Sequence, residues 1–243
     1  MSYLDNLLFG YYPYICLTVF LLGSLIRFDR DQYTWKSDSS QMLRAGQLRW
    51  GSNLFHVGVL FLFFGHSVGM LTPHFLYEPF ISAGSKQVMA MASGGLFGLL
   101  GFIGVSILLH RRLSDPRIRI NSKTSDIVML VLLWLQLALG LATIPMSAQH
   151  LDGSMMMKLA EWGQRIVTFR AGAPELLVDA SWVFKAHMFL GMSIFLVFPF
   201  TRLVHVWSGF GTAAYLIRPY QVVRSRRLGV RARHPAGSHQ RSV

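Results

Sequence analysis

Five apolar stretches, each about as long as a membrane span, dominate the pattern of hydrophobic and polar positions along the chain. A helix needs roughly 20 apolar residues to cross a hydrocarbon core of about 30 Å. Open sheets leave backbone groups unsatisfied in lipid, so the stretches favour helices. The pattern therefore predicts an all-α membrane protein, a bundle of five transmembrane helices at about residues 5–26, 52–73, 87–109, 126–145 and 182–204.

The polar segments predict how the remainder of the chain is organised. Residues 1–227 are expected to form one five-span membrane domain. Residues 228–243 are basic and interrupted by Pro and Gly, which predicts a disordered tail. Within the long segment 146–181, residues 154–169 predict a helix that lies at the membrane surface.

The distribution of charge predicts how the bundle is oriented in the membrane. The net charge of +12 at first suggests a nucleic-acid partner, but only 14% of residues are charged, against roughly 25% in soluble domains. Eighteen of the 23 lysines and arginines follow the first, third and fifth spans. Cytoplasmic loops carry such an excess of cations, which places the N-terminus outside and the C-terminus in the cytoplasm. We therefore expect membrane lipid and no nucleic acid as a partner.

Four histidines lie in two of the predicted spans, where an imidazole is costly unless it has a partner. Spans two and five run antiparallel in this topology, so His56 lies near His205 at the cytoplasmic end and His66 near His187 at the outer end. In straight helices the first two histidines are about 15 Å apart in height and the last two about 27 Å. Tilt, bending or inclined ligand directions must absorb that difference.

The surroundings of these pairs favour haem b over a bare metal ion. No carboxylate or thiolate lies nearby to complete a zinc site, and the single cysteine, Cys16, excludes a Cys-x-x-Cys site and c-type haem attachment. Haem supplies four equatorial nitrogens, so two histidines per site suffice. Gly58, Gly65, Gly69 and Gly191 either admit a flat macrocycle or serve close helix packing. A histidine proton relay or transporter remains the alternative.

The resemblance to a known family is carried by "RFDRDQYTWKSDSSQML", "SNLFHVGVLFLFFGHSVGMLTPH", "TIPMSAQHLDGSMMMKLAEW" and "FLVFPFTRLVHVWS". These motifs closely resemble the cytochrome b (gamma) subunit of bacterial membrane-bound respiratory nitrate reductase, in register over residues 1–225. The resemblance implies an inner-membrane subunit of nitrate respiration that oxidises quinol near the outer face. It implies electron transfer through two b haems to an iron–sulfur (beta) subunit and then to a molybdenum-containing catalytic (alpha) subunit, where nitrate chemistry takes place.

The resemblance also implies roles for particular residues. The family's ligands to the two haems fall on His66 and His187 for the outer haem and on His56 and His205 for the inner haem. Its quinol-binding lysine matches Lys86, although the sequence alone favours an interfacial lysine that reaches the headgroups. Gly65 would leave room for the quinol ring beside the outer pair.

Two further cations and two other functions stay open at this point. Lys185 and Arg202 each precede a paired histidine by two or three residues, so they could bind haem propionates or lipid headgroups. The nearer alternative function is a di-haem anchor of another respiratory oxidoreductase, of the formate dehydrogenase or hydrogenase type. The farther one is a haem-free transporter with histidine relays.

Overall fold

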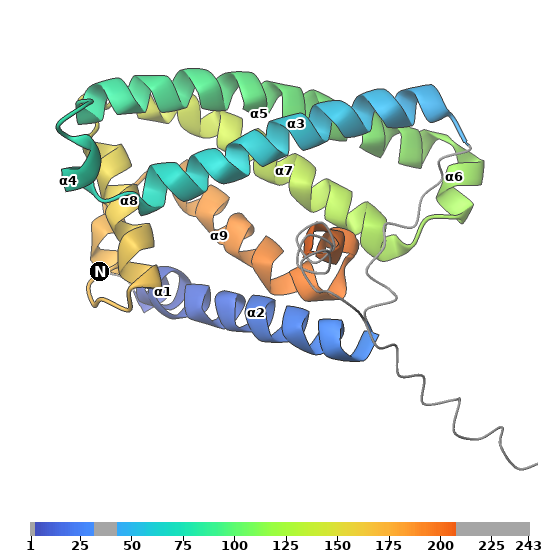
Figure 1. Ribbon diagram of the computed structural model, residues 1–243, viewed down its shortest axis with the longest axis horizontal. Helices are drawn as coiled ribbons and strands as arrows, with labels where there is room; N and C mark the ends of the chain where they lie inside the picture. Colours follow the sequence, from blue (N-terminus) through green and yellow to red (C-terminus); the bar gives the residue numbers. More distant parts are fainter. Residues whose placement is uncertain (1–2, 32–42, 208–243) are drawn as a thin grey trace, which may run out of the picture. The chain divides into compact units, whose positions relative to one another are not determined.

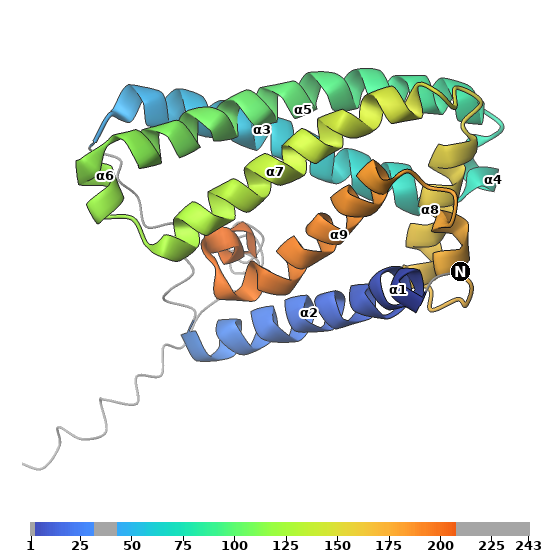
Figure 2. The same cartoon turned by 180° about the vertical axis from the view of Figure 1, so that it is seen from behind.

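The computed structural model describes residues 3–31 and 43–207, and no strand occurs among them (Figures 1 and 2). The predicted tail 228–243 lies outside the described residues. The described elements are α1 (Tyr3–Asn6), η1 (Leu7–Tyr11), α2 (Tyr12–Asp31), α3 (Ala45–Leu71), α4 (His74–Tyr77), α5 (Ala83–Ser114), α6 (Pro116–Ile120), α7 (Thr124–Ser147), α8 (Ser154–Val167), η3 (Pro174–Leu177), α9 (Trp182–Val197), η4 (Phe198–Phe200) and η5 (Arg202–Val204).

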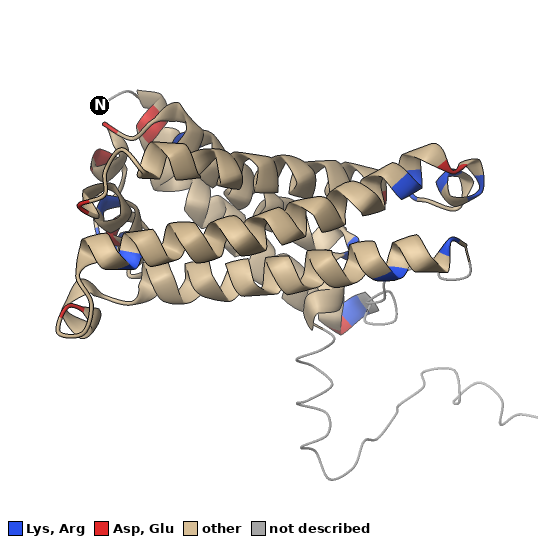
Figure 3. Cartoon of the chain, turned by 90° about the horizontal axis from the view of Figure 1, so that it is seen from above, with Lys and Arg blue, Asp and Glu red and all other residues tan. Residues whose placement is uncertain are grey.

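Among the residues that the structure describes, five helices are long and apolar enough to cross a membrane, as the sequence predicts. They are Tyr3–Arg30, Ala45–Leu71, Ala83–Ser114, Thr124–Ser147 and Trp182–Phe200. Figure 3 shows that Lys, Arg, Asp and Glu of the described residues gather toward the two ends of the long helices. The middle stretches carry almost none, as expected for segments that lie in hydrocarbon.

Several helices extend beyond their apolar stretches. α3 begins at Ala45, whereas the predicted span begins at residue 52, because the polar segment "AGQLRWG" continues the same helix. α5 begins after Ser82, whose side chain accepts a hydrogen bond from the backbone N–H of Ser85 at 3.2 Å. Such a cap satisfies a backbone donor that has no partner in the first helical turn. Hydropathy therefore located the membrane core of each helix and missed its polar ends.

Residues Met1–His205 form one compact unit; Val206–Val243 form a second, of which only Val206 and Trp207 are described. In the first unit α3 packs on α5, α5 on α7, α7 on α9 and α9 on α2, while α3 and α9 make few direct contacts. Gly58 lies where α3 and α5 pack closely: a Cβ there would be 2.5 Å from the backbone nitrogen of Gly101. Gly58 therefore serves close helix packing, one of the two roles that the sequence left open for it.

The fifth span is not one continuous α-helix, so the predicted helix over 182–204 was wrong in its last turns. α9 ends at Val197, and η4 and η5 follow with an extended Thr201 between them (φ −117°, ψ 178°). Pro199 cannot donate a backbone hydrogen bond and interrupts the helical ladder. The guanidinium of Arg27 on α2 holds the break, because it donates to the carbonyl oxygens of Pro199 at 2.6 Å and Thr201 at 2.9 Å.

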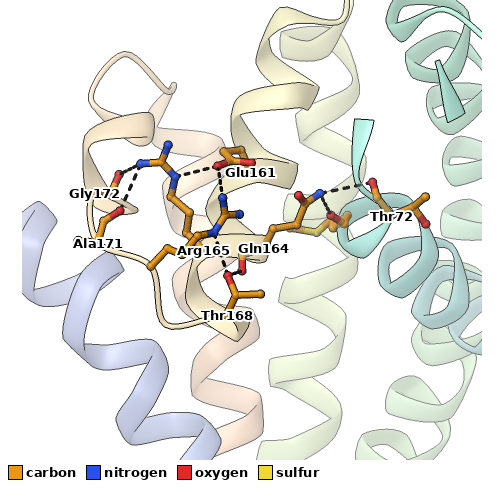
Figure 4. A network of polar contacts seen from close by, with 9 residues as sticks. Thr72, Glu161, Gln164, Arg165, Thr168, Ala171 and Gly172 are labelled. Atoms are coloured by element: carbon orange, nitrogen blue, oxygen red, sulfur yellow. Dashed lines mark hydrogen bonds and ion pairs between the residues drawn. The ribbon is translucent and has the colours of Figure 1, made fainter. Parts of the chain in front are cut away.

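The predicted surface helix within 154–169 is α8, and it ties the end of α3 to the beginning of the chain. Gln164 donates to the carbonyl oxygens of Met70 at 2.9 Å and Thr72 at 3.4 Å (Figure 4). On the opposite side Trp162 is buried, and its indole N–H donates to the carbonyl oxygen of Phe9 at 3.0 Å. α8 thus fixes the C-terminal end of α3.

A polar network keeps the segment after α8 in place (Figure 4). Glu161 accepts from Arg165 at 2.9 Å and pairs with Arg170 at 3.3 Å. Arg165 also donates to the carbonyl oxygens of Ala171 at 3.3 Å and Gly172 at 3.1 Å. These contacts are partly exposed to solvent, so each stabilises the segment only modestly, by roughly 0.2–1 kcal/mol.

Candidate functional site

The structure brings the four histidines of the predicted spans together as two pairs, each with one ring on α3. The ring centres of His66 and His187 are 6.3 Å apart, and those of His56 and His205 are also 6.3 Å apart. Two imidazoles bound to opposite sides of one metal atom, at about 2.0–2.1 Å per metal–nitrogen bond, have ring centres roughly 6 Å apart. Both pairs therefore have the spacing that a shared iron atom requires.

Hydrogen bonds fix the ring orientation of three of these histidines. Nδ1 of His56 lies 2.7 Å from the carbonyl oxygen of Ser52, and Nδ1 of His66 lies 2.7 Å from that of Leu62. Nδ1 of His205 lies 2.6 Å from the carbonyl oxygen of Arg202. A carbonyl can only accept, so Nδ1 carries the proton and Nε2 keeps a lone pair for a metal. Metal-binding histidines are commonly oriented in this way.

The break after α9 resolves the mismatch in height between the two pairs. A straight helix would separate His187 from His205 by about 27 Å along its axis. Because α9 ends at Val197 and the chain turns through η4 and η5, His187 and His205 do not lie on one straight helix, and the separation of about 27 Å is not expected between them (Figure 2). His205 thereby returns toward α3, within reach of His56.

Space for a flat group lies along α3 beside the outer pair. No other atom comes within 4 Å of the position that a Cβ would take at Gly65 or at Gly69. His66 itself is exposed, and α3 makes few direct contacts with α9. By contrast, a Cβ at Gly191 would lie 3.1 Å from the side-chain nitrogen of Gln136. Two of the four predicted glycines therefore border open space.

A cavity of about 610 Å³ lies beside the inner pair, and both His56 and His205 line it. Its volume falls within the roughly 300–1,000 Å³ that is typical of ligand and cofactor sites. Four guanidinium groups contribute to its wall: Arg49, Arg111, Arg112 and Arg202. The cavity therefore offers an apolar interior with cations at its edge, which suits an amphipathic dianion such as haem.

Asp126, at the beginning of α7, organises two of these arginines. Its carboxylate is buried and pairs with Arg112 at 3.3 Å and with Arg202 at 3.4 Å. A buried carboxylate needs such partners, because an unpaired charge in this environment is strongly unfavourable. Arg202 thus lies next to the inner pair, as its predicted role requires, and one of its partners is Asp126.

Lys86 lies at the end of α3 that carries the outer pair. Its ammonium donates to the carbonyl oxygen of Gly69 at 3.0 Å and lies 3.6 Å from the ring centre of Tyr77. Burial and the nearby carboxylate of Glu78 raise the pKa of Tyr77, so its phenol stays protonated at neutral pH. Lys86, in the first turn of α5, is therefore held inward by protein groups, and its acceptor Gly69 lies three residues along α3 from His66.

Lys185 has a different neighbour from the one predicted. Its ammonium forms an ion pair with Asp5 at 3.1 Å, which links α9 to the first turn of the chain. Its role toward a haem propionate stays a prediction.

Sequence reasoning missed three residues that shape the two sites. Asp126 could have been noticed as a carboxylate in the first turn of a span that follows a run of cations. Gly140 and Gln136 lie against His187 and Gly191 on the facing helix, which no local pattern indicates. Their positions depend on how α7 packs against α9.

The donor groups fit haem b better than a bare metal ion. Among the described residues, no three His, Cys, Asp or Glu side chains gather closely enough to hold an ion. Each histidine pair supplies two nitrogens, which is the number that a metal with four equatorial ligands of its own requires. Spacing, ring orientation and the neighbouring open space agree with such a group.

The comparisons with known proteins give the family. A family model described as nitrate reductase gamma subunit matches residues 5–226. The chain is 54% identical over 228 residues to the respiratory nitrate reductase 2 gamma chain of Escherichia coli (strain K12), covering 93% of this chain and 100% of that relative. It is 51% identical over 226 residues to the respiratory nitrate reductase 1 gamma chain of the same organism, with 93% and 100% covered.

A more distant relative agrees with these two. The nitrate reductase gamma chain of Bacillus subtilis (strain 168) is 38% identical over 222 residues, covering 91% of this chain and 98% of the relative. The matches favour nitrate reductase over a formate dehydrogenase or hydrogenase anchor and over a transporter. The chain therefore belongs to the nitrate reductase gamma subunit family and is a membrane subunit of the respiratory nitrate reductase complex.

Proposed function

We propose that this gamma subunit oxidises quinol at the Lys86 end of the bundle and delivers the electrons to the iron–sulfur subunit at the opposite end. The observation that carries the proposal is the two histidine pairs, one between α3 and α9 and one between α3 and the residue after η5, each with ring centres 6.3 Å apart. His66 and His187 would hold an outer haem b and His56 and His205 an inner one. Bound haem supplies a one-electron carrier at each position.

The chain's own residues then have distinct tasks. Lys86 would donate a charge-assisted hydrogen bond to a quinol oxygen, and Gly65 leaves space beside the outer pair for the quinol ring. At the inner end the arginines around the cavity would neutralise haem propionates, with Arg202 and Arg112 held by Asp126. Lys185, paired with Asp5, is the candidate cation near the outer pair.

The placement of quinol oxidation outside gives the subunit its energetic role. Protons would leave on the outer side while electrons move inward, so each turnover transfers charge across the membrane. One charge is worth about 2.3 kcal/mol per 100 mV, and two electrons at that potential store about 4–5 kcal/mol. This assignment requires the bacterial inner membrane, with the N-terminus outside and the C-terminus in the cytoplasm.

The experiment that tests this function is a spectrum of the purified complex. We expect two low-spin b haems per gamma subunit, each with two histidine ligands, in the reduced optical spectrum and in electron paramagnetic resonance. Reduction of both by quinol, followed by reoxidation with nitrate, would complete the support. A gamma subunit that carries no haem absorbance would instead favour the transporter with histidine relays.

The proposed orientation predicts where the iron–sulfur subunit binds. The contact should involve the loop 28–50, of which residues 32–42 lie outside the described part, and the segment 209–227, which lies wholly outside it. Photo-cross-linkers at either place should capture the partner, because an electron must leave from the inner end. Cross-linkers within 146–181 serve as the control and should not capture it. Capture from that external segment alone would mean that the topology is inverted.

A further inference from the structure

His187 differs from the other three paired histidines in how its second nitrogen is held. Nδ1 of each of the others lies 2.6–2.7 Å from a carbonyl oxygen three or four residues earlier in its own segment. Nδ1 of His187 is buried, and no group in the described part of the chain forms a hydrogen bond with it. A buried ring nitrogen without a partner costs free energy, so the position needs an explanation.

The ring of His187 lies directly over a glycine of the neighbouring helix. A Cβ at Gly140 on α7 would lie 3.0 Å from Cε1 of His187 and 3.6 Å from its Nδ1. The backbone of Gln136, one helical turn earlier, is the polar group that faces this ring. A helical carbonyl points along the helix toward the residue four positions later. The missing side chain at Gly140 therefore leaves the carbonyl of Gln136 accessible from α9.

We propose that Gly140 is a positioning residue for the outer haem. It provides the surface on which the His187 ring lies, and it lets Nδ1–H donate to the carbonyl oxygen of Gln136 while Nε2 faces the His66 side. The inference rests on the proposed function, because it assigns His187 as a haem ligand. It differs from that function in placing the orienting contact on α7, a helix that carries no ligand.

The facing helices supply matched controls. Gly191 lies on α9 opposite Gln136, and a Cβ there would meet the end of the flexible Gln136 side chain at 3.1 Å instead of a ligand ring. Gly94 on α5 has no atom within 4 Å of its Cβ position. Alanine at Gly94 or Gly191 changes helix propensity as much as alanine at Gly140 does, but neither methyl group touches His187.

The test is the haem content and spectrum of purified complexes that carry Gly140→Ala, Gly191→Ala or Gly94→Ala. Loss of an orienting contact to a metal-binding histidine typically lowers affinity by about 10- to 100-fold. In Gly140→Ala we therefore expect a lost outer haem, or one with an altered resonance signal and midpoint potential. The inner haem should keep its wild-type signal, which also reports that the bundle has folded. Both control variants should retain two haems.

A fourth variant separates the backbone of Gln136 from its side chain. Gln136→Ala keeps the carbonyl that the proposal uses, so its outer haem signal should match wild type. Loss of the outer haem in this variant would overturn the assignment of the backbone as acceptor. A wild-type outer signal in Gly140→Ala, or equal loss of both haems, would overturn the role of Gly140. Wild-type complex without haem would overturn the proposed function itself, together with this inference.

Discussion

His66→Ala or His187→Ala is expected to remove the outer haem and to leave the inner haem largely intact. In the proposed function each histidine supplies one of the two protein ligands of its site, and the two pairs are separate, with His56 and His66 ten residues apart on α3. Removal of one histidine leaves only one protein ligand for the iron, so the low-spin site with two histidine ligands is lost. His56→Ala and His205→Ala should show the reverse pattern. Optical and resonance spectra of the purified variants measure the outcome.

The matched control for this series is His150→Ala. His150 is an exposed histidine in the loop after α7 and belongs to neither pair. It should retain both haems. If every paired histidine variant lost both haems equally, two separate sites would not exist. If His66→Ala lost the inner haem instead, the proposed pairing would be wrong.

Lys86→Ala is expected to abolish most quinol oxidation while both haems stay bound. The ammonium lies beside the outer pair, held by the carbonyl oxygen of Gly69, and is not itself a candidate ligand to iron. A charge-assisted hydrogen bond to a quinol oxygen is worth about 1.5–3 kcal/mol, or roughly ten- to hundredfold in binding or rate. Lys86→Arg should be intermediate, because it keeps the charge but replaces a point donor with a planar fork.

Two measurements separate this role from a structural one. Lys86 also binds a carbonyl in the last turn of α3, so haem content and reduction by a small artificial donor must be measured first. Lys158→Ala, which removes a partly exposed lysine of α8 paired with Asp179 at 3.5 Å, is the control and should turn over quinol normally. Quinol turnover in Lys86→Ala within about twofold of wild type would contradict the proposed role and would assign Lys86 to contact with lipid headgroups.

The spans were predictable because hydrocarbon imposes one requirement on every residue that it contacts. The apolar stretches therefore located the five long helices of the described residues, whereas the orientation across the membrane that the cation bias indicates stays a prediction. The break at Pro199 was not predicted, since "FLVFPFTRLV" is apolar enough to pass for continuous helix. What stabilises the break is a contact from Arg27 on α2, more than 170 residues away in sequence.

In the candidate site, too, some residues could be predicted from the sequence and others depend on how the helices pack. His56, His66, His187 and His205 stood out because a titratable ring in a span is costly, a property of the single residue. Asp126 and Gly140 carried no such signal: one is an acidic residue near a helix start and the other a small residue in an apolar run. Their significance depends on which helices become neighbours, and packing in lipid is poorly encoded in local sequence.

The links between α3 and α9 also constrain how the subunit can be made. His56 and His66 belong to the first third of the chain, whereas their partners belong to its last quarter. Chains are synthesised from the N-terminus, so α3 enters the membrane while α9 is still untranslated. Under the proposed function, neither haem could gain its second protein ligand until the fifth span has been inserted, and the outer site would become complete before the inner one. Haem capture would then come at the end of biogenesis, and a nascent chain that stalls before Trp182 would hold no haem with two histidine ligands.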